Sequence, residues 1–274
     1  MIHNAHRKIQ SLIREMINEI DIAEIGQTCW APRSSHDIKT CTLGGDEYFL
    51  KFSEPHLFDA DDPSLQILNE YLAYRIFRLF PGVVIPGRIE LVYDRSKKRV
   101  GLMTSSVKNA VTRPISREEL AALLSTSVYA SIFLAHWDIS NTANIVVSSD
   151  KNSATIIDPG GTMDFRARGE RKGKLFGDNP GELNSMMGPN SMTTIFKGAD
   201  LRKAANVFLA VEWSEISSTI ESVSRDIKDE LQSRGMDDLL SQWNRYVSHI
   251  TPILAKRHKP VVLHAEHILD TSGS

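Results

Sequence analysis

The chain changes its hydrophobic pattern between its first and second parts. Along one expected strand, Tyr48, Leu50 and Phe52 point to one face and the residues between them to the other. From the middle of the chain onward, apolar residues recur every three to four positions instead, which is typical of helices. The pattern therefore predicts an α+β protein, with a small antiparallel-sheet lobe at residues 26–106 and a mainly helical lobe at residues 107–274.

Two hairpins and one helix are expected in the sheet lobe. The first hairpin has strands at residues 36–43 and 47–52, and the glycine-containing turn between them suits a tight reversal. The second has strands at residues 83–92 and 99–104. A helix between the hairpins is predicted to begin at Asp62, as N-cap, with a proline at its first position, and to stop before Pro81.

The helical lobe opens with a capping box at Ser116, which predicts a helix that runs to Ala135. A short polar hairpin is expected within residues 135–161. Three further helices are predicted, at residues 200–210, 215–233 and 237–258. The last residues, from His264 onward, end in a polar tail. Apolar residues at helical spacing also predict an N-terminal helix within residues 1–25.

Composition and charge exclude several classes of protein. The net charge of −2 and the pI near 6.5 give no overall basic field, so nucleic acid is not an expected partner. No apolar run approaches the roughly 18–20 residues that span a bilayer. Cys29 and Cys41 form no CxxC pair, which argues against a disulfide scaffold or zinc site and favours a reducing compartment. Charges interrupt the apolar runs at the start of the chain, so we expect a cytoplasmic protein, or one exported without a cleaved signal peptide.

Five polar residues stand where phosphoryl transfer would need them. Transfer depends on positioning and charge neutralisation, and Lys51, in the middle of an apolar strand, can hold phosphates. Glu70, near the buried edge of the next helix, can hold that lysine. Asp158 and Asn144 are oxygen ligands of the type that Mg²⁺ prefers. Asp138, in the loop before the polar hairpin, can orient or deprotonate an acceptor hydroxyl.

The chain resembles the protein-kinase-like superfamily, in the atypical bacterial branch that includes HipA-like kinases and phosphoinositide-kinase-like enzymes. The resembling segments are YFLK at 48–51, NEYLAYRIFRLFPGVVIP at 69–86, HWDISNTANIVV at 136–147 and IIDPGG at 156–161. The resemblance implies a two-lobed kinase-like fold and transfer of the γ-phosphate of ATP, with Mg²⁺, to a hydroxyl group, foremost a protein Ser or Thr. It also implies that Met103 contacts the nucleotide.

Three departures from the family pattern leave alternatives open. Five residues rather than four separate Asp138 from Asn144, so Asn141 is a competing metal ligand, although Asn144 directly precedes the apolar strand. DPG replaces DFG. No GxGxxG precedes the lysine, and the hydroxyls of Ser34 and Ser35, in a turn before the first hairpin, are candidate phosphate contacts or part of a plain surface loop.

A basic, loop-like segment follows Asp158. It is either a solvated loop or a docking surface for an acidic or phosphorylated acceptor. Its basic residues are Arg166, Arg168, Arg171, Lys172 and Lys174. The alternatives to a protein kinase are a kinase-fold enzyme that transfers AMP or activates a carboxylate, a nucleotide-binding pseudokinase, and a small-molecule or lipid kinase. A compact kinase of this kind would suit a bacterial toxin or effector.

Overall fold

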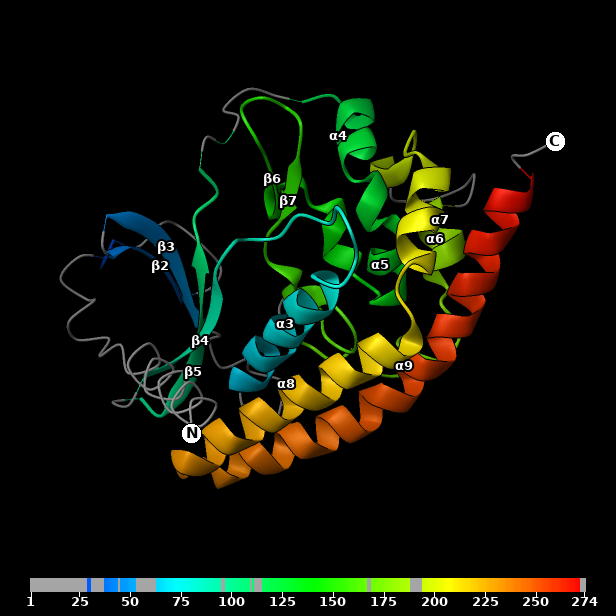
Figure 1. Cartoon of the computed structure of the whole chain (residues 1–274). Helices are drawn as coiled ribbons and strands as arrows, with labels where there is room; N and C mark the ends of the chain where they lie inside the picture. Colours follow the sequence, from blue (N-terminus) through cyan, green and yellow to red (C-terminus); the bar gives the residue numbers. More distant parts are fainter. Residues whose placement is uncertain are drawn as a thin grey trace, which may run out of the picture.

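A computed structural model describes most of the chain, and it consists of a sheet-rich part and a helical part (Figure 1). The described residues are 29–30, 37–43, 45–52, 63–94, 97–108, 110, 115–166, 169–187 and 194–271. The predicted α+β class is confirmed, with a small antiparallel sheet in the N-terminal part and mainly helices in the C-terminal part. The predicted N-terminal helix, Ser34, Ser35 and the cap at Asp62 lie outside the described residues.

The sheet has five antiparallel strands in the order β1-β2-β3-β5-β4. The strands are β1 (Cys29–Trp30), β2 (Asp37–Leu43), β3 (Asp46–Phe52), β4 (Ile89–Asp94) and β5 (Arg99–Ser105). Both predicted hairpins are present. The predicted strand at residues 83–92 starts only at Ile89, because residues 83–88 make a single bridge, from Val84 to Thr155.

The two faces of β3 are separated as the alternating pattern predicts. Tyr48, Leu50 and Phe52 are buried in a small core with Met103, while Lys51 lies on the opposite face. Across this core, Gly101 makes room for the Phe52 ring, since a Cβ at residue 101 would lie 2.4 Å from a ring carbon. Of the β3 residues on that opposite face, Glu47 and Phe49 are exposed and Lys51 is buried, on the side of the sheet that faces the helices.

The first strand pair places the two cysteines of the sequence in register. The backbone of Cys41 on β2 pairs with that of Cys29 on β1, and Cys41 is disulfide-bonded. A single bond is not a disulfide scaffold, so the expectation drawn from the lack of a CxxC pair stays a prediction.

Helix α3 (Ser64–Phe77) crosses the sheet and is covered by other elements. All its residues except Tyr71 and Arg75 are buried, so it is a core helix rather than an amphipathic surface helix. It contacts β4 and β5 on one side and α8 and α9 on another. Glu70 is therefore held inside the protein by the packing of the whole helix.

The helical part differs from prediction at three places. Its helices are α4 (Arg117–Leu123), α5 (Val128–Phe133), α6 (Glu182–Met187), α7 (Leu201–Leu209), α8 (Trp213–Ser233) and α9 (Asp237–Thr271). The capping box at Ser116 is confirmed, but a 3₁₀ turn splits the helix that was expected to reach Ala135. Helix α6 was not predicted. Helix α9 continues beyond 258 through Pro260, because the packing of Val261 and Ala265 outweighs the cost of a proline.

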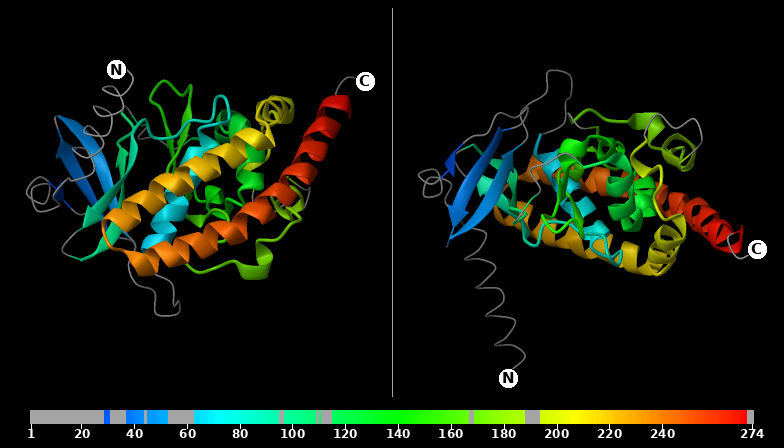
Figure 2. Two further views of the ribbon diagram at one scale, coloured as in Figure 1. Left: turned by 60° about the horizontal axis from the view of Figure 1, so that its bottom comes forward. Right: turned by 90° about the horizontal axis from the view of Figure 1, so that it is seen from above.

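Helices α8 and α9 form a long antiparallel pair along one side of the molecule, beneath α3, and the second half of α9 continues past α5 and α7 (Figures 1 and 2). No helix in the described part of the chain is long and apolar enough to cross a membrane.

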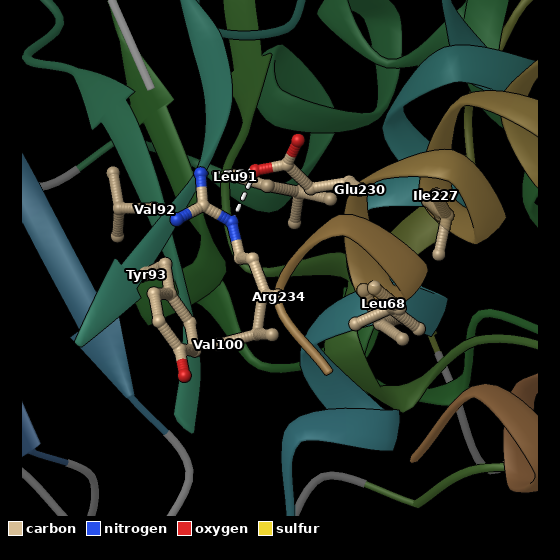
Figure 3. A pocket seen from close by; sticks show the side chains of 9 residues that line it. Leu68, Leu91, Val92, Tyr93, Val100, Ile227, Glu230 and Arg234 are labelled. Atoms are coloured by element: carbon tan, nitrogen blue, oxygen red, sulfur yellow. Dashed lines mark hydrogen bonds and ion pairs between the residues drawn. The ribbon is translucent and has the colours of Figure 1, made fainter. Parts of the chain in front are cut away.

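A small hollow marks the seam between α8 and the sheet (Figure 3). Arg234 lies over the Tyr93 ring, 4.7 Å from its centroid, and forms an ion pair with Glu230 one turn earlier. The enclosed volume is about 10 Å³, which is room for about one water molecule. The hollow is a packing seam that ties α8 to the sheet, and it contains none of the predicted site residues.

Candidate active site

The centre of the site is a buried ammonium group between two carboxylates. Lys51 on β3 donates to Oε2 of Glu70 on α3 at 2.7 Å and to Oδ1 of Asp158 at 2.5 Å. The Lys51 and Glu70 side chains are 9% and 2% exposed, whereas Asp158 is 35% exposed. The structure thus brings together three predicted site residues from three distant segments, with Asp158 on the solvent side.

Charge is unbalanced within this group. Burial alone would lower the pKa of Lys51, but the carboxylates of Asp158 and Glu70 outweigh it and raise the pKa. Burial raises the pKa of Glu70 to about 7; Lys51 opposes this rise and Asp158 adds to it. Two carboxylates therefore share one ammonium, so the group favours a further positive charge beside Asp158.

The backbone at Asp158 is held in an uncommon conformation. Its φ of 57° and ψ of 59° are left-handed, a region that aspartate tolerates better than most residues. The Asp158 N–H donates to the Tyr74 hydroxyl at 2.9 Å, and that hydroxyl is anchored on α3. Directly afterwards, Gly160 leaves no room for a side chain, because a Cβ there would lie 2.9 Å from Oε2 of Glu70. The small residues of the DPGG sequence allow Asp158 to approach Lys51.

Asp138 lies on a 3₁₀ turn, Trp137–Ser140, that follows α5 and a buried histidine. The Asn144 side-chain amide donates to the Asp138 carbonyl at 3.2 Å and so holds the turn. Burial raises the pKa of Asp138, and the ammonium of Lys172 lowers it. His136 is fully buried, and burial lowers its pKa to about 3, so this histidine is neutral at physiological pH.

The structure separates the two asparagines that competed as metal ligands. The Asn144 carbonyl accepts from the N–H of Ile157, the residue before Asp158, at 2.9 Å. Asn141 is exposed, and its side-chain oxygen accepts from Ala143 N–H at 3.2 Å as a local cap. Asn144 therefore lies next to the residue before Asp158, across the hairpin of β6 (Ile145–Val147) and β7 (Ala154–Ile156), and its role as a metal ligand stays a prediction.

Asp158 and Asn144 offer oxygen donors of the type that Mg²⁺ takes, and a metal at this place stays a prediction. Among the described residues, no three His, Cys, Asp or Glu side chains gather around one point. Mg²⁺ is commonly held by one or two protein oxygens, and phosphate and water oxygens complete its shell. Asp158 is partly exposed and belongs to a cluster with excess negative charge. Together with the neighbouring Asn144 it could supply such protein oxygens.

The basic segment after Asp158 is not a uniform basic surface. Arg166 and Lys174 are exposed, but Arg171 pairs with Asp164 at 3.1 Å and stacks on the Phe165 ring. Lys172 is buried. Arg168 lies outside the described residues. The reading of this segment as a solvated loop is therefore wrong for Lys172, and any docking surface here has fewer exposed cations than the sequence indicated.

Sequence reasoning missed a second group of residues that fix the site. The Asn69 side-chain amide donates to the carbonyls of Gly160 and Thr162, both at 3.3 Å, and its oxygen accepts from the Tyr246 hydroxyl of α9. An asparagine beside Glu70, among the apolar residues of this helix, was a usable signal. Tyr246 offered none, because a single tyrosine in a long helix is indistinguishable from ordinary core.

The remaining predicted nucleotide contacts are not tested. Met103 is 2% exposed and packs with Leu50 and Phe52 in the small core of the sheet. Its contact with a nucleotide stays a prediction, as do those of Ser34 and Ser35.

Lys51→Met is expected to lower the free energy of unfolding by about 3 kcal/mol at pH 8, because a buried carboxylate loses its partner. The pKa of Glu70 rises further in this variant, so its folded state binds more protons than its unfolded state from about pH 4.5, the ordinary value, up to the raised folded value. The variant therefore loses less stability at pH 5. Denaturant titrations at both pH values measure this. The double variant Lys51→Met/Glu70→Gln should recover much of the loss, and an equal loss at both pH values would contradict the assignment.

Comparisons with known proteins add little to this geometry. No protein-family model matches the chain, and no curated protein matches it in sequence. Among solved structures, the chain is similar to the crystal structure of a Helicobacter pylori proinflammatory kinase, CtkA, with 13% sequence identity and a TM-score of 0.44. The match covers 85% of this chain and 94% of that one. A likeness of this size assigns neither a reaction nor a substrate to the chain.

Proposed function

We propose that the protein is an ATP- and Mg²⁺-dependent phosphotransferase that moves the γ-phosphoryl group to a hydroxyl acceptor, most simply a Ser or Thr of a protein. One observation carries the proposal: the Lys51 ammonium is held between a buried Glu70 and a partly exposed Asp158. A purely structural ion pair would not need a second, solvent-facing carboxylate on the same lysine.

Each group in the triad then has a distinct role. Glu70, fixed by the packing of α3, keeps the Lys51 ammonium at one place, and Lys51 binds phosphate oxygens of the nucleotide. Asp158 and Asn144 would hold Mg²⁺. When bound, Mg²⁺ supplies positive charge that offsets the negative charge of the phosphates. Asp158 would then exchange part of its contact with Lys51 for the metal.

Asp138 would position the acceptor. The acceptor oxygen forms a bond to the γ-phosphorus, the bond from that phosphorus to the β,γ-bridging oxygen breaks, and ADP leaves. The hydroxyl proton passes to the Asp138 carboxylate and then to water. Burial, which raises the pKa of Asp138, makes this carboxylate a better proton acceptor than an exposed aspartate.

The acceptor itself follows from weaker observations. Exposed Arg166 and Lys174, on the segment after Asp158, favour an acidic or phosphorylated acceptor. The proposed placement among HipA-like or phosphoinositide-kinase-like enzymes, and a role as a bacterial toxin or effector, rest on the sequence motifs alone. Transfer of AMP and nucleotide binding without catalysis remain the competing functions.

The mass of the modified acceptor tests the proposal. Incubation with Mg²⁺ and ATP should add about 80 Da per transfer, the mass of one phosphoryl group, to the protein itself or to proteins of an added lysate. An addition of about 329 Da would instead identify AMP transfer. Mg²⁺ with a non-hydrolysable ATP analogue should raise the unfolding temperature, because a ligand of the folded state stabilises it. A protein that the nucleotide stabilises but that modifies nothing would be a pseudokinase.

A further inference from the structure

Lys172 is a buried lysine that the proposed reaction does not use. It is 3% exposed, and its ammonium donates to the carbonyl oxygens of Ala135, Gly161 and Met163 at 2.6, 2.8 and 2.9 Å. The Trp137 ring also faces it, 4.7 Å from centroid to Nζ. Burying an ammonium group away from water costs free energy, so the burial of Lys172 calls for a reason beyond packing.

The three carbonyls belong to two loops that each carry a site aspartate. Ala135 lies three residues before Asp138, and Gly161 lies three residues after Asp158. Ala135 and Met163 both have left-handed backbones, with φ of 51° and 50°, which are strained for residues with a side chain. The same two loops also meet through the Met163 N–H, which donates to the Leu134 carbonyl at 2.6 Å.

We propose that Lys172 is a positioning residue: its ammonium, bound to the carbonyls of Ala135, Gly161 and Met163, fixes the Asp138 loop against the Asp158 loop. The proposal rests on the phosphotransfer function proposed above. In that reaction the acceptor at Asp138 and the nucleotide at Asp158 must be held at one distance, and small displacements reduce rate steeply. Three strong donors at the junction of the loops set that distance.

The surroundings of Lys172 make the clamp sensitive to pH. Burial lowers the pKa of Lys172 to about 7. A buried guanidinium on α9 lowers this pKa as well, and carboxylates of α6 and of both loops oppose the shift. The charged groups that face it are Glu182, Asp138, Arg257 and Asp164. His136, also close by, stays neutral, with a pKa near 3. A neutral amine has two donors and cannot serve three carbonyls, so the clamp weakens as pH rises above 7.

Stability should move in the opposite direction over the same interval. The pKa of Lys172 is near 7 in the folded state and about 10.5 in the unfolded chain. Between these values the unfolded state binds more protons, so the contribution of Lys172 to stability rises with pH. A fall in activity between pH 7 and 9 would therefore come from the site and not from unfolding.

Two variants of Lys172 and one matched control test the clamp in phosphotransfer assays. Lys172→Met should lower kcat about 10- to 100-fold and change the KM for ATP less than about threefold, since nucleotide contacts remain. Lys172→Arg should recover most of kcat, because the guanidinium keeps the positive charge and offers five N–H donors to the three carbonyls. Lys228→Met, an exposed lysine on α8, should behave as wild type.

The pH profile separates positioning from a general structural role. Wild-type kcat should fall about tenfold or more from pH 7 to 9, as the ammonium fraction falls to about one hundredth. Lys172→Arg should keep its rate over this range. A flat wild-type profile, or Lys172→Met with wild-type kcat, would overturn the proposal.

A measurement without catalysis keeps the two proposals distinguishable. Amide hydrogen exchange at pH 7 should be faster in Lys172→Met than in wild type at residues 134–138 and 160–165, and unchanged in α8 and α9. Faster exchange in a protein that transfers no phosphate would support the clamp and reject the phosphotransfer function. Unchanged exchange would reject the clamp whatever the activity.

Discussion

Asp158→Asn is expected to lower kcat/KM for phosphotransfer by at least about 1000-fold. The substitution keeps the size of the side chain and the left-handed backbone, which asparagine also tolerates, but removes the charge that would hold Mg²⁺. Initial rates measured over a range of Mg²⁺ concentrations should not recover at high Mg²⁺. A variant that retains a tenth of wild-type activity would contradict the metal role.

Stability provides the control for this variant. Asp158 raises the pKa of Glu70, so its removal leaves Lys51 paired with one carboxylate rather than shared by two. The free energy of unfolding should therefore stay within about 1 kcal/mol of wild type or rise slightly. Inactivity that came with a large loss of stability would point to misfolding instead.

The two competing asparagines give a matched pair for the same metal site. Asn144→Ala should raise the Mg²⁺ concentration needed for half-maximal rate by about tenfold, because it removes one of the two protein oxygens proposed to hold the metal. Asn141→Ala removes only a local cap to Ala143 and should leave the Mg²⁺ requirement unchanged. The reverse result would move the ligand role to Asn141.

The elements that were predicted well are those whose signals come from a few neighbouring residues. Alternation along β3 and the capping box at Ser116 each depend on a few neighbouring residues. The errors came where tertiary contacts decide. Pro260 normally argues against a helix, yet α9 continues through it because Val261 and Ala265 pack into the core. The strand expected from residue 83 is irregular up to residue 88, because this part makes a single β-bridge, from Val84 to Thr155 of β7.

The sequence predicted those site residues whose type was unusual for the segment in which they lie. Lys51 in an apolar strand was an anomaly and Glu70 on the next helix was its candidate partner, and the structure places the two in contact. Lys172 was hidden by its neighbours, because a lysine among arginines and glycines resembles a solvated loop. Its burial depends on the Asp138 loop and on α6, which lie elsewhere in the sequence. Asn69 donates to backbone carbonyls and accepts from the Tyr246 hydroxyl, and these partners lie far from it in the sequence.

Asp138→Asn is expected to lower kcat about 100- to 1000-fold with little change in the KM for ATP. The amide keeps the shape of the side chain and can still hydrogen-bond an acceptor, but it cannot take its proton. Asn144 donates to the backbone carbonyl of Asp138, so the substitution leaves this contact in place. Single-turnover transfer separates this step from binding. Asp150→Asn, in the exposed turn of the β6–β7 hairpin, is the matched control and should keep wild-type rate. Because a loose transition state places little demand on a base, a loss below about tenfold would assign Asp138 to orientation alone and contradict its role as proton acceptor.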